Sequence, residues 1–207
     1  MKRLFISVFF ICFAFPGNCQ LKNADINFLK YINTHRNENL DKSFQFLSNT
    51  SDFVAIGEPL VLLGVGFYKN DAYLKKQGVN AAVATLGTYS LGYIVKKSVN
   101  RNRPYQTYPE IEHYETKLGS SFPSGSTSLA FSAATSISLS YPKWQVIAPA
   151  AVYAVGVGYS RLHLGAHYPS DVLAGAILGS GSAVISRYLN GLLLKQYRKK
   201  QISKNSF

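Results

Sequence analysis

Three short clusters of the sequence contain residue types that bind and transfer a phosphoryl group. Lys96 and the pair Arg103-Pro104 form the first cluster, residues 121–126 form the second, and residues 160–171 form the third. Each cluster lies at an end of an apolar segment that is predicted to be a helix. If successive segments run in alternate directions, all three ends meet on one side of the molecule. The sequence therefore predicts a single site built from all three clusters.

The basic residues of these clusters suit an oxyanion. Arginine presents forked N–H donors that match pairs of oxygen atoms, and lysine adds a compact positive charge. Lys96, Arg103 and Arg161 can together surround the three equatorial oxygens of a phosphoryl group. Basic residues near one another are most often a solvated edge. Their combination with the other two clusters favours an oxyanion site.

The second cluster is expected to open a helix at the anion. Pro123-Ser124-Gly125 comes directly before an apolar run, so free backbone N–H groups and the positive helix end would point at a bound anion. Gly125 has no Cβ and allows a close backbone approach.

His167 is the predicted nucleophile, because an unprotonated imidazole can attack phosphorus. Asp171, four residues later, can hold the other ring nitrogen and stabilise the imidazolium that forms. It can also be a first-turn acid that favours the helix dipole, and both roles can hold at once. Cysteine chemistry is set aside, since Cys12 and Cys19 both fall near the N-terminus.

The three clusters resemble the motifs of the type 2 phosphatidic acid phosphatase family, which is related in site design to vanadium-dependent haloperoxidases. KKSVNRNRP contains Lys-x6-Arg-Pro, SFPSGSTS resembles Pro-Ser-Gly-His, and SRLHLGAHYPSD matches Ser-Arg-x5-His-x3-Asp. The resemblance extends from Lys96 to Asp171 and into the stretch VLAGAILG. It implies an all-α fold, a phosphohistidine intermediate on His167 with Asp171 as its orienting residue, and no metal or other cofactor. Its substrates would be lipid phosphates or diphosphates. The implied phosphate-binding residues are Lys96, Arg103, Ser124, Gly125 and Arg161.

One position departs from the family pattern. The family has a histidine after Pro-Ser-Gly that protonates the leaving oxygen and later activates water, and here that position is Ser126. A serine hydroxyl does not titrate near neutrality, and losing a positioned acid/base typically costs on the order of 100- to 10,000-fold in rate. Three interpretations stay open: a weakened or inactive phosphate binder, replacement by another group such as His163 or His113, or a leaving group that needs little help. A diphosphate fits the third, because a phosphate monoester leaves as a stabilised anion, so an isoprenyl diphosphate is favoured over phosphatidic acid.

The elements that must position these residues are apolar helices. The 207 residues suit one domain, and only 15% of them are charged against roughly 25% in soluble domains. The fold class is predicted to be all-α: a bundle of about five to six apolar helices that span a membrane, with the active site at one end. The phosphatase-like domain is expected over residues 20–190, before a basic tail over residues 191–207. The apolar stretches are residues 53–68, 77–95, 126–141, 144–159 and 172–186.

The distribution of charge predicts a membrane orientation. Residues 1–19, with an apolar run from Leu4 to Phe15, are expected to be a signal peptide or a first membrane anchor. If later segments each cross once, the inner side receives the basic residues of the 69–76 connection, Lys143 and the tail, as the positive-inside rule requires. The site then faces outside, in the inner or plasma membrane or on an exported periplasmic protein. A soluble helical protein with small packing residues is the alternative.

The predicted function is hydrolysis of a lipid-linked phosphate or diphosphate. Its expected partners are a phosphorylated lipid or other small phosphate ester and the membrane. The net charge of +12 also suits nucleic acid, but no nucleic-acid motif accompanies it. Ser126 favours a second hypothesis, a non-catalytic phospholipid-binding protein. It weakens a third, vanadate-dependent halide oxidation, which also needs an acid/base histidine.

Overall fold

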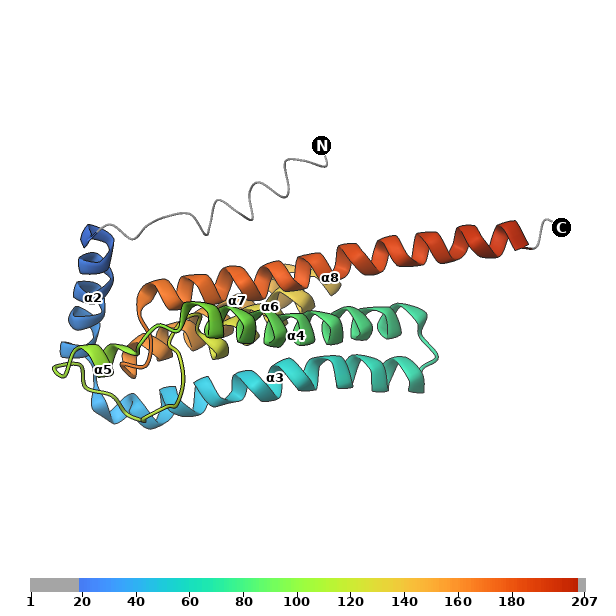
Figure 1. The fold of residues 1–207 in the computed structure, drawn as a ribbon. Coiled ribbons are helices and arrows are strands. Elements are labelled where there is room, and N and C mark those ends of the chain that lie inside the picture. Colours follow the sequence, from blue (N-terminus) through green and yellow to red (C-terminus); the bar gives the residue numbers. More distant parts are fainter. Residues whose placement is uncertain (1–18, 205–207) are drawn as a thin grey trace.

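The computed structural model describes residues 19–204, and these residues form an all-helical bundle (Figure 1). The helix α2 (Cys19–Thr34) lies across one end of the bundle, and the 3-10 turn η1 (Glu38–Leu40) and the short α5 (Pro104–Thr107) lie at the same end. The predicted all-α class is confirmed. The predicted signal or anchor segment lies, apart from Cys19, outside the described residues. The long helices that run along the bundle are α3 (Asp41–Tyr68), α4 (Ala72–Val99), α6 (Gly125–Ser140), α7 (Trp144–His163) and α8 (Pro169–Lys204).

The bundle buries small and polar side chains and exposes large apolar ones. The side chains of Phe53 and Val152 are 78% and 72% exposed. This is the distribution expected where lipid surrounds the helices, because lipid tails solvate apolar side chains while polar groups find partners between helices. Two helices, Glu38–Tyr68 and Pro169–Leu192, are long and apolar enough to cross a membrane. The buried polar residues of the interior include Ser48, Ser51, Gln77, Asn80, Thr88, Ser132, Ser136 and Ser140.

Small residues bring α8 close to α6. A Cβ atom added to Gly175 would lie 2.7 Å from the carbonyl oxygen of Ser124, and one added to Gly179 would overlap the carbonyl of Ser128. Glycines four residues apart on α8 therefore let the two backbones touch. This contact fixes the first residues of α6 against the first turns of α8.

A proline inside α3 leaves one backbone carbonyl free to accept a hydrogen bond from α4. Pro59 has no N–H to give to the carbonyl of Ala55, which lies one turn earlier in α3. The hydroxyl of Thr85 in α4 donates to that carbonyl at 2.9 Å. A buried hydrogen bond between neighbouring helices thus replaces the one that proline removes.

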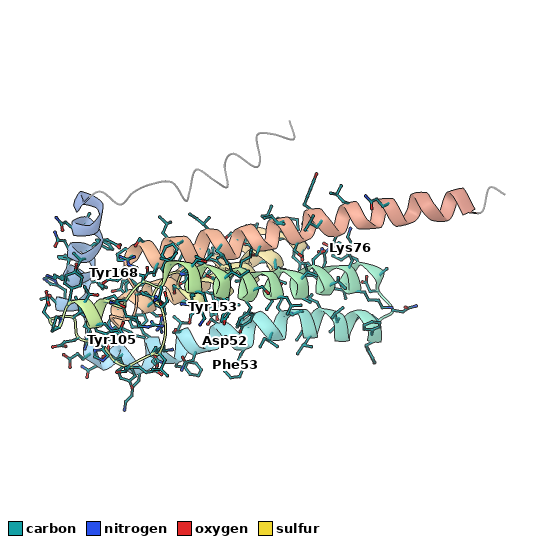
Figure 2. All side chains as sticks on the ribbon, viewed as in Figure 1. Asp52, Phe53, Lys76, Tyr105, Tyr153 and Tyr168 are labelled. Carbon is teal, nitrogen blue, oxygen red and sulfur yellow. The ribbon has the colours of Figure 1, made fainter. Side chains whose placement is uncertain are left out.

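The ends of the helices meet as the alternating direction of the apolar segments predicts. α4 and α7 end, and α6 and α8 begin, at the end of the bundle where α2 lies (Figure 1). Figure 2 shows Tyr105 and Tyr168 at this end and Lys76 at the opposite one. α4 continues to Val99, and the connection from there to α6 contains the short α5.

Candidate active site

The predicted site residues come from the ends of α4, α5, α6, α7 and α8. Lys96 lies in the last turn of α4 and Arg161 in the last turn of α7, while Arg103 is the N-cap of α5. His167 follows in the turn between α7 and α8, and Asp171 lies in the first turn of α8. Two of these residues are in direct contact, since a guanidinium nitrogen of Arg103 lies 3.3 Å from Nε2 of His167.

His167 is buried with its two ring nitrogens in different surroundings. Arginine has donors only, so Nε2 accepts from Arg103, and the ring proton sits on Nδ1. Nδ1 lies 3.5 Å from Oδ2 of Asp171 and has no hydrogen-bond partner in the described part of the chain. Burial lowers the pKa of His167 to about 3, so the imidazole is neutral at physiological pH. The lone pair of Nε2 therefore points towards the basic residues, as a nucleophile at phosphorus requires.

The three predicted phosphate-binding cations lack a carboxylate partner among the described residues. Lys96 donates to the carbonyl of Ser120 at 2.8 Å, and Arg103 donates to the carbonyls of Gly119 and Ala166 at 3.2 and 3.1 Å. Arg161, only 1% exposed, donates to the hydroxyl of Ser48 at 2.6 Å.

Arg161 also has an unused donor, since its buried Nε has no hydrogen-bond partner in the described residues. A buried charge is costly unless an opposite charge accompanies it. Arg103 and Arg161 are buried and Lys96 is half-buried, so these three cations beside one imidazole form a site that a bound oxyanion would complete.

Asp171 is fully buried and each of its carboxylate oxygens has partners. Oδ1 accepts from Arg101 at 2.7 Å. Oδ2 accepts from the backbone N–H of Tyr168 at 2.9 Å and from the hydroxyl of Ser121, and it is the oxygen that faces His167. The carboxylate is thus held on the Nδ1 side of the imidazole.

The predicted helix opening lies at the same end. Ser124 is the N-cap of α6, and Gly125 is its first residue. The Ser124 hydroxyl bonds to Thr127 at 2.8 Å and its N–H donates to the backbone carbonyl of Asp171 at 3.0 Å, so this serine fixes α6 to α8. A Cβ on Gly125 would meet no atom within 4 Å, which leaves open space beside the start of α6. Ser126 follows and is half-buried.

The two histidines considered as substitutes at position 126 have other partners. Nε2 of His163 lies 3.0 Å from Oδ1 of Asp41, and its ring packs against Phe44. His113 stacks on Tyr105 with ring centroids 4.1 Å apart. His163 is thereby tied to the start of α3, and His113 to the loop.

The structure adds three residues for which no individual role was predicted. Arg101 pairs with Asp171 and, at 2.7 Å, with Asp25 of α2. Asp25 is the single acidic residue of α2, which was the only hint in the sequence. Lys117 belongs to the loop that supplies the carbonyls for Lys96 and Arg103, and the hydroxyl of Tyr105 bonds to its backbone. Burial, followed by the positive charge of Arg161, lowers the pKa of Lys117.

A neutral imidazole lies beside a buried carboxylate and three cations that have no carboxylate partner within residues 19–204, and this arrangement is typical of one class of protein. The class is a helical membrane protein with a phosphoryl-transfer site at one end of its bundle. The particular family follows from sequence comparison, since residues 77–193 match the PAP2 superfamily. More than half of the chain is matched, and the chain belongs to this superfamily. It is accordingly a membrane-associated phosphate ester hydrolase.

Similar proteins include curated relatives and solved structures. The chain is 29% identical over 172 residues to "Undecaprenyl-diphosphatase" of Sulfolobus acidocaldarius, which covers 82% of this chain and 80% of the relative. The structure of LpxE from Aquifex aeolicus is similar with a TM-score of 0.67 and 27% identity, over 79% of this chain and 94% of that one. A PAP2 type phosphatidylglycerolphosphate phosphatase from Bacillus subtilis shares the fold, with a TM-score of 0.69 and 22% identity over 92% and 95% of the two chains.

Proposed function

We propose that this protein hydrolyses lipid-linked diphosphates, with an isoprenyl diphosphate as the favoured substrate, through a phosphohistidine intermediate. The observation that carries the proposal is the absence, among the described residues, of a carboxylate partner for Lys96, Arg103 and Arg161 beside the neutral His167. A terminal phosphoryl group supplies the missing negative charge.

The reaction proceeds in two displacements. Nε2 of His167 attacks the terminal phosphorus, the bond to the bridging oxygen breaks, and the lipid monophosphate leaves with the electron pair. Lys96, Arg103 and Arg161 neutralise the oxygens of the transferred group, and Asp171 stabilises the imidazolium. Water then attacks phosphorus, the P–N bond breaks, inorganic phosphate leaves, and the proton of the water passes to solvent.

Ser126 and Lys117 both support a diphosphate over a monoester. Ser126 is not an acid that can protonate a poor alkoxide leaving group. A lipid monophosphate leaves as a stabilised anion. Lys117 lies in the loop whose Gly119 and Ser120 carbonyls contact Arg103 and Lys96, and in the substrate-free protein it pairs with Glu115 at 3.5 Å. In this proposal Lys117 binds the leaving phosphate. The relative from Sulfolobus acidocaldarius is named an undecaprenyl-diphosphatase, which agrees with this substrate class.

The site faces the outer side of the membrane in this proposal. Lys69, Lys75 and Lys76 lie in or beside the α3–α4 connection and Lys143 lies in the α6–α7 connection, both at the end of the bundle opposite the site. Basic residues collect on the cytoplasmic side of membrane proteins. The opposite end, with His167, is then external.

The experiment is phosphate release by the detergent-purified protein from an isoprenyl diphosphate, the matching isoprenyl monophosphate and phosphatidic acid. We expect turnover of the diphosphate to exceed that of both monoesters, and His167→Ala to abolish it. Rapid quenching with diphosphate labelled at the terminal phosphorus should trap an acid-labile phosphoprotein that His167→Ala lacks. Equal turnover of diphosphate and monoester would contradict the leaving-group argument.

Ser126 also favours a second function, a phospholipid-binding protein with little or no catalysis. In that case the wild-type protein binds a phosphate analogue such as orthovanadate but releases no phosphate from any of the three substrates. Ser126→His would then restore release. Turnover by the wild-type protein would exclude this second function.

A further inference from the structure

Arg101 lies beside the candidate active site but, unlike the three predicted phosphate-binding cations, it forms ion pairs with carboxylates. Its guanidinium donates to Oδ1 of Asp171 at 2.7 Å and to the hydroxyl of Ser170 at 2.7 Å, while its other terminal nitrogen donates to Oδ2 of Asp25 at 2.7 Å. The ring of Tyr168 lies under the guanidinium, 3.7 Å from its carbon to the ring centroid. Since its terminal nitrogens and its flat face all have partners, Arg101 is not free to bind phosphate.

Asp25 holds this arrangement from another helix. Its Oδ1 accepts from the backbone N–H of Ser170 at 2.8 Å, and its Oδ2 accepts from the Ser170 hydroxyl at 2.5 Å. Asp25 therefore binds the start of α8 as well as Arg101, where a negative charge also suits the helix dipole. Ile26 and Leu29 anchor α2 by packing with Leu162 and Tyr168 in a buried cluster.

The contact with Arg101 determines how the carboxylate of Asp171 is oriented towards His167. With Oδ1 fixed by Arg101, Oδ2 turns to His167, whose Nδ1 has no other partner in the described residues. A planar guanidinium can bridge two carboxylates in a fixed geometry, which a lysine cannot do. Without Arg101 the carboxylate would be held at Oδ2 alone, by Ser121 and the N–H of Tyr168, and could swing away from Nδ1. The tautomer with its proton on Nε2, which cannot attack through Nε2, would then compete with the one that the Arg103 contact favours.

We propose that Arg101, fixed by Asp25 of α2, is a positioning residue that holds Asp171 in the orientation that keeps the ring proton of His167 on Nδ1. α2 lies outside the region matched to the PAP2 superfamily, so this chain completes its site with a residue from beyond that region. The inference rests on the proposed function for its kinetic consequence, but the tautomer can be measured without turnover.

The kinetic experiment compares Asp25→Asn, Arg101→Met, Arg101→Lys and the double variant Asp25→Asn/Arg101→Met on the diphosphate substrate. We expect kcat to fall about 10-fold in Asp25→Asn and about 100-fold in Arg101→Met, with KM within about two-fold of wild type, because a misplaced orienting carboxylate weakens the transition state more than the bound substrate. Arg101→Lys should not restore kcat. Asp25→Asn should cost no more than two-fold in the Arg101→Met background, because Asp25 acts through Arg101.

The matched control is Lys30→Met. Lys30 is also on α2 and forms an ion pair of 2.8 Å with Glu110, so its loss weakens the docking of α2 without touching Arg101. We expect kcat within two-fold of wild type. A fall of kcat in this control as large as in Asp25→Asn would show that docking of α2, rather than its carboxylate, sustains activity.

The direct measurement is the ¹⁵N NMR spectrum of histidine-labelled protein in detergent, with His167 assigned through His167→Asn. Wild type should show the Nδ1–H tautomer, and Arg101→Met should shift a substantial share to Nε2–H. An unchanged tautomer in Arg101→Met, or a large rise of KM at constant kcat, would overturn the proposal. If the wild-type protein turns over no substrate, the proposed function fails, while the NMR result still decides the role of Arg101.

Discussion

Replacement by methionine should raise the free energy of unfolding at Arg161 and lower it at Arg101, although both arginines lie at the same end of the bundle. Arg161→Met removes a guanidinium that is 1% exposed and whose one protein partner among the described residues is the Ser48 hydroxyl. Removing an uncompensated buried charge relieves its desolvation cost, and an increase in the free energy of unfolding of about 1–2 kcal/mol is reasonable for the ligand-free protein. For a chain of this length that corresponds to a rise in Tm of about 2–8 °C.

Arg101→Met should have the opposite effect. It leaves Asp171, which is fully buried, and Asp25, which is partly buried, without their cation. Breaking a buried ion pair typically costs about 3–5 kcal/mol in the free energy of unfolding. Because the Arg101 side chain is 24% exposed, we expect a loss at the lower end, about 3 kcal/mol. Tm should then fall by about 6–12 °C.

The assay is thermal unfolding of detergent-purified protein with and without orthovanadate, which has the charge and shape of the transferred group. An anion at 100 times its Kd stabilises the folded state by about 2.7 kcal/mol. Wild type should show this gain, and Arg161→Met should lose most of it. If Arg161→Met lowers Tm in the absence of vanadate and keeps the full vanadate response, then Arg161 is a structural residue and the reasoning from uncompensated charge is wrong.

Three further predictions concern pH, packing and specificity. Burial lowers the pKa of His167 to about 3, so the folded protein is most stable above the unfolded pKa of about 6.5 and loses up to about 1.4 kcal/mol per pH unit as pH falls towards 3. His167→Asn should remove this pH dependence of the free energy of unfolding in denaturation measured between pH 4 and 7. An unchanged slope would contradict the prediction. Gly179→Val should lower the free energy of unfolding by about 1–3 kcal/mol, since a Cβ there overlaps the carbonyl of Ser128. Gly181→Ala should leave the free energy of unfolding nearly unchanged, because a Cβ at that position meets no atom within 4 Å. Equal losses in the two variants would argue against the α6–α8 contact. Lys117→Met should reduce kcat/KM for the diphosphate about 10-fold more than for the monophosphate in the phosphate-release assay, and equal losses would remove Lys117 from leaving-group binding.

Local sequence was enough for the fold class and for most of the candidate site. A helix end is a local feature, so Lys96, Ser124, Arg161 and Asp171 could be assigned to ends by the apolar runs beside them. Alternating helix direction then requires those ends to meet. The serine at position 126 can likewise be recognised from the sequence, because it stands where the family pattern has a histidine after Pro-Ser-Gly.

Only the tertiary structure decided which basic residues have counter-charges. By residue type alone Arg101 and Arg161 are equivalent. Arg101 is nevertheless neutralised by Asp171 and by Asp25, which are 70 and 76 residues away in the chain, while Arg161 donates to a hydroxyl. The physical reason is that the electrostatic environment of a buried group depends on atoms within a few ångströms, and these come from distant segments brought together by packing. The sequence by itself determined where the charges lie along the helices, and the packing of α2, α7 and α8 determined which of them remain available to a substrate.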